Sequence, residues 1–404
     1  MRKTDFFKST HDHKQIRVLH LLEATLGGTG RHISDLLSGL NQDYADDIEL
    51  HLGYSLRRAD SKFEPALRSL ESAGVKCFQC DMARSISLKS DIDAVLQVAQ
   101  YARNYQIDII HTHSAKAGYV GRLASKFSGR TQSVYTPHSS PFRLSTSYHL
   151  LEVLAGWMMS DAIIAVSESE KHELIINKIC PKEKIRVINH GVLDVENRYS
   201  VNDDPVARKN KTYVVGTVGR LTPQKAPHRF VQIAEQTLAK FPEARFVWIG
   251  DGEMREEIEQ LILMKGLAEK VCITGWLDNI DRALLSLDVF LLASDYEALS
   301  YAPIEAMRAG LPCILSNVTG STDLVEDAKT GFLVQLDNID GYVRSIHQLL
   351  ADVQLRHIMG QAGRKRWHEK FQRTSMVSNT VHLYHELLPK HLSMKEGKAT
   401  LQKL

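Results

Sequence analysis

Two glutamates eight residues apart carry the first chemical signal in this sequence. Glu297 follows the apolar run 289–293, which predicts a short buried strand, and Glu305 comes just after Pro303. Proline suits the first turn of a helix because its missing N–H would have no partner there. We therefore expect a helix from Pro303 to about Gly310, with Glu305 in its first turn and Glu297 on the loop that leaves the strand.

The residues between the glutamates add a set of N–H donors, which belong to Leu299, Ser300 and Tyr301. The first N–H groups of a helix lack partners within the helix, and the helix dipole favours an anion beside them. Two carboxylates next to that anion can accept hydrogen bonds from hydroxyls of the same ligand. The stretch therefore suits a sugar attached to a phosphate, although either glutamate alone is equally well explained as a solvated residue.

A second group of residues follows the predicted strand 213–218. Gly219, Arg220 and Lys225 lie in a strand-to-helix loop, and parallel sheets bind ligands at the loops that leave the carboxyl ends of their strands. A planar guanidinium and an ammonium both suit a diphosphate. Each cation taken singly is also explained as an ordinary surface residue.

Glycines separate the first predicted strand, residues 16–22, from a helix predicted over residues 33–40. Residues 27–30 read Gly-Gly-Thr-Gly, which predicts a loop whose N–H groups can approach a phosphate or an acceptor. This is not the dinucleotide-binding fingerprint, because the spacing differs and no acidic residue ends the second strand. A purely structural tight turn is the alternative.

Histidines end two neighbouring strands of the same half. His111 and His113 close the predicted strand 107–111, Lys116 follows them, and His138 follows strand 133–136. Because strand positions alternate between two faces, we expect His111 and His113 to face opposite sides and not to share a metal. His113 and Lys116 are candidate acceptor or phosphate contacts, and His111 is expected to be a packing residue.

Strand-like runs alternate with amphipathic segments along the chain, which predicts parallel sheets covered by helices on both faces. The predicted strands are residues 16–22, 48–53, 107–111, 133–136, 162–166, 213–218, 244–249, 271–274, 289–293 and 313–316. The polar stretch 197–211 breaks the alternation and predicts a linker. We expect an α/β fold with an N-terminal domain over residues 1–200, a C-terminal domain over 201–374, and a returning helix and basic tail over 375–404.

Together these features resemble the retaining glycosyltransferases marked by a Glu-x7-Glu motif, family 4 of the GT-B architecture, in which two Rossmann-like domains face each other across a cleft. The resemblance runs from about Ile16 to Leu388. It implies transfer of a sugar from a nucleotide-sugar, with UDP favoured over GDP, to a hydroxyl of a glycan or a lipid-linked acceptor. The glycine-rich stretch and the Lys116 region further resemble bacterial enzymes of capsule, O-antigen and exopolysaccharide synthesis.

The resemblance also implies individual roles. Glu297 would lie beside the donor sugar, Glu305 would hold the ribose, and Ala298 stands where the family usually has glycine. The implied catalytic residues are His138, Glu297, Arg220 and Lys225. The implied donor contacts are Gly28, Gly219, Arg220, Lys225, Gly250, Trp276, Leu277, Glu297, Leu299, Ser300, Tyr301 and Glu305. The implied acceptor contacts are Gly27, Thr29, His113 and Lys116.

No metal or cofactor and no covalent nucleophile are expected, because the family is described as using the leaving phosphate as base. The Asp-x-Asp at Asp91 and Asp93 falls in a helical stretch, away from any strand end. Two alternatives remain open: a nucleotide-sugar 2-epimerase of the same fold and a non-catalytic sugar-nucleotide-binding protein. Release of free epimer without an acceptor would identify the first.

Composition limits the other possibilities. The chain has 404 residues, 43% of them hydrophobic and 24% charged, with a formal net charge of +2, which fits two globular domains and gives no reason to expect nucleic acid. Five cysteines favour a reducing compartment, and Cys77 and Cys80, which have no second pair to complete a zinc site, are expected to end a strand. We find no signal peptide and no apolar run of the ~20 residues that span a bilayer, so we expect a cytoplasmic protein, peripheral on a membrane at most.

One apolar segment bears on the acceptor. Residues 148–159 are strongly apolar for a helix beside a cleft. Packing in the core is the simpler explanation, and contact with a lipid-linked acceptor or a membrane surface is the alternative.

Overall fold

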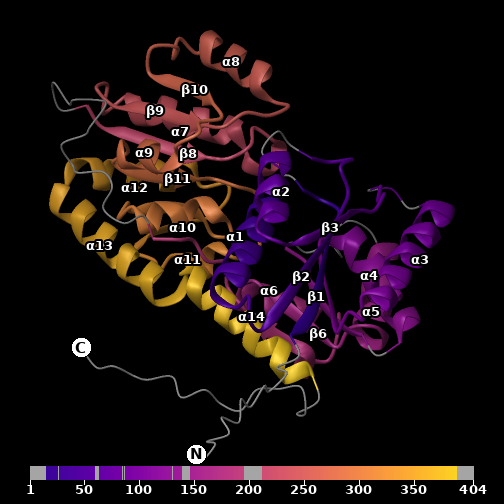
Figure 1. Cartoon of the computed structure of the whole chain (residues 1–404). Helices are drawn as coiled ribbons and strands as arrows, with labels where there is room; N and C mark the ends of the chain where they lie inside the picture. The colour runs from indigo at the N-terminus through magenta and orange to yellow at the C-terminus, as the bar shows by residue number, and fades with distance from the viewer. Residues whose placement is uncertain are drawn as a thin grey trace, which may run out of the picture.

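The computed structural model describes residues 15–25, 27–59, 63–83, 85, 87–129, 131–138, 146–194 and 212–388, with the main chain alone at 146–148. The predicted linker 197–211 and the basic tail from residue 390 lie outside the described residues. Two sheets, each flanked by helices, make up the N-terminal and C-terminal halves of the molecule (Figure 1).

The first sheet has seven parallel strands in the order β3-β2-β1-β4-β5-β6-β7. Its strands are β1 (Ile16–Leu22), β2 (Ile48–Tyr54), β3 (Lys76–Gln79), β4 (Ile109–His113), β5 (Gln132–Thr136), β6 (Ala162–Ala165) and β7 (Ile185–Val187). The helices of this half are α1 (Gly27–Asp43), α2 (Phe63–Ser72), α3 (Leu88–Asn104), α4 (Ala115–Ser128), α5 (Thr146–Met158) and α6 (Glu168–Ile176). Strands covered on both faces explain the near-continuous apolar runs.

The second sheet has six parallel strands in the order β10-β9-β8-β11-β12-β13. Its strands are β8 (Val214–Val218), β9 (Arg245–Ile249), β10 (Val271–Gly275), β11 (Val289–Leu292), β12 (Cys313–Ser316) and β13 (Gly331–Val334). Its helices are α7 (Pro227–Leu238), α8 (Arg255–Met264), α9 (Ile280–Leu285), α10 (Tyr301–Arg308), α11 (Ser321–Leu324), α12 (Ile339–Ala351) and α13 (Val353–Lys370). A 3-10 turn, η3 (Pro223–Lys225), follows β8.

The last helix, α14 (Arg373–Leu387), returns to the first half and lies beside α1 (Figure 1). The approach is close, because a Cβ at Gly39 of α1 would lie 2.5 Å from Cγ2 of Val377. Met376, Val377 and Tyr384 are buried in the same core as β1 and β2. The helix thus ties the end of the chain to the first sheet.

All ten predicted strands are present, each with ends within two residues of the prediction. The edge strands β7 and β13 were not predicted. β7 has three residues with Arg186 in the middle, and β13 begins with Gly331, so neither gives a continuous apolar run. The predicted loop over residues 27–30 was wrong, since this stretch is the first turn of α1. Gly27 enters it with a φ of 66°, and a Cβ at Gly30 would lie 2.3 Å from the carbonyl oxygen of Thr25, so glycine is required there.

Candidate active site

The carboxyl edge of the second sheet brings two of the predicted catalytic residues together. Nζ of Lys225, from η3, lies 2.5 Å from Oε1 of Glu297, on the loop between β11 and α10. The two side chains are 14% and 8% exposed. The left-handed conformation of Ala226, with a φ of 49°, turns the chain from η3 into α7. An ammonium and a carboxylate thus face each other at the edge where parallel sheets bind ligands.

Glu305 lies on α10, where the two halves of the molecule meet. It is the fifth residue of α10 and not in its first turn, because the helix begins at Tyr301, earlier than predicted. Burial raises the pKa of its carboxyl, and the nearby Arg31 opposes that rise. Nη1 of Arg31, on α1, lies 3.4 Å from Oε1 of Glu305. The carboxylate is therefore largely buried, with 9% of its side chain exposed, and a cation of the first half lies beside it.

The glycine-rich start of α1 lies against the loop that follows β8. A Cβ at Gly27 would lie 3.6 Å from Nε of Arg220, whereas one at Gly28 would meet nothing within 4 Å. Thr29 is partly buried in the same turn. The N-terminus of one helix and a guanidinium from the other half are thus adjacent, which suits an anion.

The glycines of the second half form a close-packed corner. A Cβ at Gly250 would lie 2.1 Å from the carbonyl oxygen of Gly219 and 3.4 Å from the ring of Trp276. Trp276 is 50% exposed at the end of β10, and Leu277 beside it is partly buried. Main chain and an exposed indole thus border the loop that carries Arg220.

His138 has both ring nitrogens engaged by other histidines. Its Nε2 lies 3.1 Å from Nδ1 of His113 and its Nδ1 lies 3.3 Å from Nε2 of His190. It is held in a left-handed conformation with a φ of 60°, a region that histidine visits more readily than most residues and that often occurs at functional sites. In this arrangement a ring hydrogen bond to a donor sugar requires one of these contacts to open.

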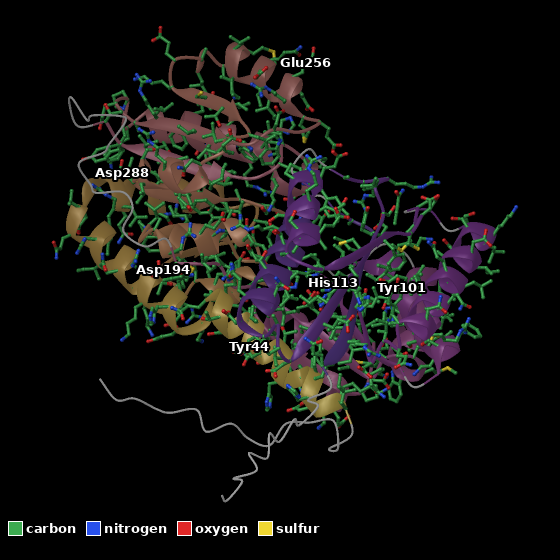
Figure 2. All side chains as sticks on the ribbon, viewed as in Figure 1. Tyr44, Tyr101, His113, Asp194, Glu256 and Asp288 are labelled. Carbon is green, nitrogen blue, oxygen red and sulfur yellow. The ribbon has the colours of Figure 1, made fainter. Side chains whose placement is uncertain are left out.

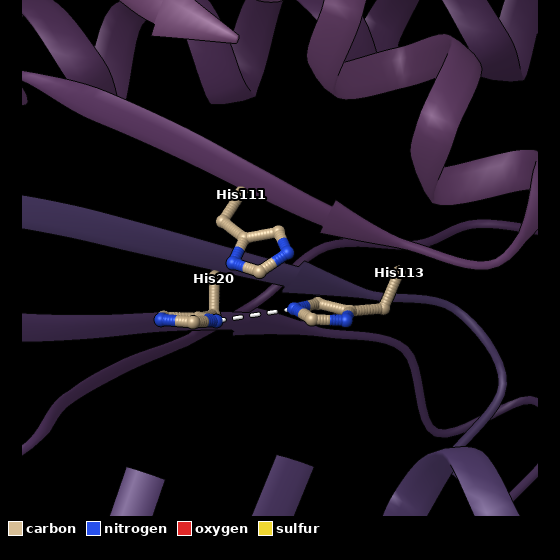
Figure 3. A group of neighbouring side chains, drawn as sticks. All are labelled: His20, His111 and His113. Atoms are coloured by element: carbon tan, nitrogen blue, oxygen red, sulfur yellow. Dashed lines mark hydrogen bonds between the residues drawn. The ribbon is translucent and has the colours of Figure 1, made fainter. Parts of the chain in front are cut away.

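His111 and His113 point to the same side of the first sheet, so the prediction that they face apart was wrong. Positions two apart in a strand share a face, and the two ring centroids are 4.2 Å apart. His20 of β1 lies beside both (Figure 3). One ring nitrogen from each of His20, His111 and His113 lies within 4.8 Å of the others, and the same holds for His32, His113 and His138. The argument against a shared metal therefore fails, although neither group alone indicates one.

His190 and His32 were not singled out from the sequence. His190 follows β7, one of the strands that the apolar pattern did not reveal, and its Nδ1 lies 2.9 Å from the carbonyl oxygen of Leu299. Nδ1 of His32 lies 3.1 Å from the hydroxyl of Tyr301. Both contacts join the first half to the start of α10. The available signals were a histidine three residues after β7 and one in the second turn of α1.

Burial keeps these imidazoles neutral. It lowers the pKa of His20 to about 3 and that of His190 to about 4. It also lowers the pKa of His111, His113 and His138 well below the usual range, with smaller contributions from neighbouring histidines. In Figure 2, His113 lies nearer to the C-terminal half than Tyr101 of α3 does.

Lys116 is already paired within the first half. Its Nζ lies 2.7 Å from both carboxylate oxygens of Asp91, and its side chain is 8% exposed. Asp91 lies on α3, as predicted for the Asp-x-Asp stretch. Lys116 can contact an acceptor only if its pair with the partly exposed Asp91 is rearranged.

Asp323, which had no predicted role, joins α11 to the start of α6. Its Oδ1 accepts a hydrogen bond of 2.8 Å from the N–H of Glu168, and its Oδ2 one of 3.2 Å from the N–H of Ser169. Ser167 adds a hydroxyl that donates to the carbonyl oxygen of Ala298 at 3.1 Å. These contacts hold the loop with Glu297 against the first half.

The apolar helix α5 buries one side, with Glu152 and Ala155, and exposes the other, so the simpler prediction of core packing holds for one side alone. Leu150, Leu154 and Trp157 are 59%, 46% and 54% exposed, and Met158 is 69% exposed. Helix α3 of the same half also exposes Leu88, Ile92 and Leu96. Among the residues that the structure describes, no helix combines the length and apolar character needed to span a bilayer.

Two family models match this chain. The model described as Glycosyltransferase Family 4 matches residues 26–194, and the one described as Glycosyl transferases group 1 matches residues 201–366. The first range begins after β1 and contains the other strands of the first sheet, and the second contains the whole second sheet and ends within α13. Together they cover most of the chain.

Curated relatives and solved structures agree with these models. The UDP-Gal:alpha-D-GlcNAc-diphosphoundecaprenol alpha-1,3-galactosyltransferase of Escherichia coli is 27% identical over 398 residues, covering 94% of this chain and 99% of its own. The capsular polysaccharide biosynthesis glycosyltransferase CapM of Staphylococcus aureus is 26% identical over 342 residues, covering 78% and 86%. The structure of Anabaena HepE with UDP and glucose superposes with a TM-score of 0.79 at 22% identity, covering 92% of this chain and all of that one.

Proposed function

This chain belongs to the family 4 glycosyltransferases, and from that premise we propose that it transfers a sugar from a UDP-sugar to a hydroxyl of a lipid-linked glycan. The transfer would retain the anomeric configuration and serve the synthesis of a bacterial surface polysaccharide. The observation that carries the proposal is the pairing of Lys225 with Glu297 at the carboxyl edge of the second sheet, beside Arg220 and the N-terminus of α10. The epimerase and non-catalytic alternatives are not favoured by the relatives, which are named as transferases.

The charges of these residues match the charges that develop during transfer. Cleavage of the glycosidic bond places negative charge on the leaving diphosphate, and Arg220, Lys225 and the first N–H groups of α10 would stabilise it. Glu297 would accept a hydrogen bond from a sugar hydroxyl once the ammonium of Lys225 turns to the phosphate. Because two side-chain cations supply the positive charge, we propose a reaction that needs no metal.

Two observations favour UDP as the nucleotide of the donor, with GDP as the second choice. The name of the Escherichia coli relative includes UDP-Gal, and the Anabaena structure holds UDP. In this chain, the exposed ring of Trp276 lies beside Gly250, and this ring and the main chain of the adjacent Leu277 would contact the base. Glu305 would accept hydrogen bonds from the ribose hydroxyls.

The exposed helices of the first half support a lipid-linked acceptor. Leucine, tryptophan and methionine side chains of α5 face solvent, and the basic residues Lys178 and Lys182 nearby in the chain are exposed as well. An apolar helix flanked by lysines suits the interface of an anionic membrane. We therefore propose that the enzyme works as a peripheral protein at the membrane that holds its acceptor.

Calorimetric binding of UDP, GDP and ADP without divalent metal tests the donor site. We expect UDP to bind, and Glu305→Ala to weaken binding at least tenfold, because a hydrogen bond to a charged group contributes about 1.5–3 kcal/mol. Glu369→Ala on α13, whose side chain is 55% exposed, is the matched control and should bind as wild type does. Failure of all three nucleotides to bind would overturn the assignment.

Sedimentation with vesicles tests the membrane surface. Vesicles with anionic lipid should retain the wild type, and Trp157→Asp should release it. Ile358→Asp places the same charge on an apolar side chain that is 54% exposed in the other half and should leave binding unchanged. Equal partitioning of the three proteins would overturn this part of the proposal while leaving the donor site intact.

A further inference from the structure

A continuous line of hydrogen-bonded side chains runs across the first sheet to the loop before α10. It starts at Oγ1 of Thr136, 2.8 Å from Nε2 of His111, whose Nδ1 lies 2.6 Å from the hydroxyl of Tyr384. That hydroxyl lies 3.3 Å from Nε2 of His20, and Nδ1 of His20 lies 3.1 Å from Nε2 of His113 (Figure 3).

The second part of the line carries it to the other half of the molecule. Nδ1 of His113 contacts Nε2 of His138 at 3.1 Å, and Nδ1 of His138 contacts Nε2 of His190 at 3.3 Å. The last contact joins Nδ1 of His190 to the carbonyl oxygen of Leu299 at 2.9 Å. We call this line of seven contacts the histidine chain.

The carbonyl at its end gives the histidine chain a direction. A carbonyl oxygen can only accept, so Nδ1 of His190 carries the proton and its Nε2 must accept. The same reasoning then applies to each neutral ring in turn, so that His138, His113 and His20 also carry their protons on Nδ1. Tyr384 must donate to His20 and accept from His111, and Thr136 must donate. A single assignment of protons therefore fills all seven contacts, and every ring is neutral.

The end of the histidine chain lies in the loop that the proposed donor site uses. The carbonyl of Leu299 and the N–H of Ser300 belong to one planar peptide and point in opposite directions. Ser300 is the N-cap of α10, so a donor that holds the carbonyl also sets the direction of an N–H at the proposed phosphate site. His190 adds a ring stacked on Tyr301, with centroids 4.5 Å apart.

We propose that the histidine chain makes His190 a positioning residue for donor binding: as a fixed Nδ1–H donor it holds the Leu299–Ser300 peptide in the orientation that presents the Ser300 N–H to the diphosphate. This role rests on the proposed function. The upstream rings keep His190 in that tautomer, since a proton on its Nε2 would point at the proton on His138 and leave the carbonyl of Leu299 without a donor.

A metal among the same rings is the competing explanation. Imidazole nitrogens that share a tetrahedral zinc at about 2.0–2.1 Å lie roughly 3.3–3.4 Å apart, and each needs a free lone pair. In the histidine chain the ring nitrogens are already engaged in hydrogen bonds that satisfy them in one direction, which is the state that buried polar groups need. The hydrogen-bonded arrangement is therefore the one that the contacts favour.

Nitrogen NMR of protein labelled at histidine tests the chain itself. Two-bond nitrogen–proton correlations distinguish the Nδ1–H tautomer from the Nε2–H tautomer and from the charged ring, and single His→Gln variants assign the signals. We expect neutral Nδ1–H rings at all five histidines of the chain, which are His20, His111, His113, His138 and His190. An Nε2–H ring at His113, His138 or His190, or one equivalent of zinc in the purified protein whose removal shifts these signals, would overturn the chain.

Binding of UDP and donor kinetics test the positioning role. His190→Phe keeps the ring volume and removes the donor, so we expect UDP to bind about tenfold more weakly and the donor KM to rise more than kcat falls. His190→Gln retains a donor and an acceptor and should recover binding to within about threefold. Tyr384→Phe, at the far end, should leave UDP binding within about twofold, because the carbonyl of Leu299 and the nearer rings of His138 and His113 still fix the tautomer of His190.

The outcomes separate this inference from the proposed function. If UDP binds and Glu305→Ala abolishes binding, but His190→Phe binds as wild type does, the positioning role is wrong and the donor site stands. Equal losses for His190→Phe and Tyr384→Phe would also overturn it, since they would reflect general damage. If UDP does not bind at all, the positioning role fails together with the donor site, and the NMR result still decides the histidine chain. Circular dichroism and thermal unfolding of each variant confirm that it is folded.

Discussion

The two sheets of this molecule are both parallel, but they bury different kinds of side chain. The second has an almost wholly apolar interior, where the strands bury few polar side chains, among them Thr217 and Ser316. The first buries His20, His51, His111 and His113 on its strands. Residues 212–388, as far as the structure describes them, contain no fully buried histidine. One half thus places its chemistry on the loops, and the other carries a polar network through its core.

This difference determines which residues of each half can change partners without loss of stability. In the second half, Lys225 and Glu297 lie on loops above an inert sheet, so they can change partner without disturbing the core. In the first half, the histidines stabilise one another only while every contact is made, because a buried polar group without a partner costs free energy. We infer that the first half is the more easily unfolded by any change that alters the charge of its interior.

Acidification should have the largest effect, and it should destabilise the first half and not the second. The pKa values of the buried histidines in the folded state lie far below 6.5, at about 3 for His20 and about 4 for His190. Between these values and pH 6.5, the unfolded state therefore binds more protons than the folded state does. The free energy of unfolding that these neutral rings contribute is fully present above pH 6.5. It falls as the pH drops towards 4, by up to about 1.4 kcal/mol per pH unit for each ring. We expect several kcal/mol to be lost by pH 5.

Hydrogen exchange, corrected for the intrinsic effect of pH, measures this loss in each half separately. Amides of β1 and β4 should lose protection between pH 7 and pH 5, while those of β8 and β11 keep theirs. Urea at pH 7 is the control, since it acts on both halves without charging the rings. Equal loss of protection in the two sheets on acidification would contradict the comparison.

The contrast also explains what the sequence could predict. The pairing of Lys225 with Glu297 follows from two motifs at the ends of strands β8 and β11, which are adjacent in a parallel sheet. The histidine cluster depends on strand register, since His20 is aligned with His111, and Leu22 with His113. The sequence of one strand does not predict which residues of the next strand it is aligned with. His190 follows a three-residue strand that gave no recognisable pattern. Local motifs were therefore predictable, and the network that crosses strands was not.

A buried ion pair of the first half gives the next largest expected effect. Both carboxylate oxygens of Glu152 lie 3.1 Å from Nη2 of Arg122, and the guanidinium lies 4.1 Å above the ring of Tyr135. Glu152→Ala leaves an unpaired buried cation and should lower the free energy of unfolding by about 3–5 kcal/mol. Chemical denaturation measures it. The double variant Arg122→Met with Glu152→Met should recover most of the loss, and no recovery would show that packing and not charge causes it.

Lys225→Met should lower activity strongly and lower stability less than Glu152→Ala does, because its partner Glu297 lies on a loop and can turn towards solvent. Removing a preorganised charge from the leaving group should lower kcat/KM about 10²–10³-fold, with the donor that calorimetry identifies. Lys365→Met, whose side chain is 79% exposed, is the control for loss of a positive charge. A stability loss as large as that of Glu152→Ala, or unchanged kcat/KM, would contradict the division between the halves.

The smallest expected effect is a gain in stability, in the first half, with the opposite dependence on pH. Burial raises the pKa of Glu170 to about 7, and its Oε1 has no hydrogen-bond partner among the described residues, while its Oε2 accepts from the N–H of Val166 at 2.7 Å. The folded state therefore binds more protons than the unfolded state between pH 4.5 and 7, so this carboxyl destabilises the protein as the pH rises. Glu170→Gln keeps the acceptor without the charge and should stabilise the protein by about 1 kcal/mol at pH 8, with the gain vanishing near pH 4.5. Denaturation curves at the two pH values measure the difference. An equal gain at both pH values would show that packing, and not the loss of the charge, causes it. Buried charge would then contribute less to the difference between the two halves than we infer.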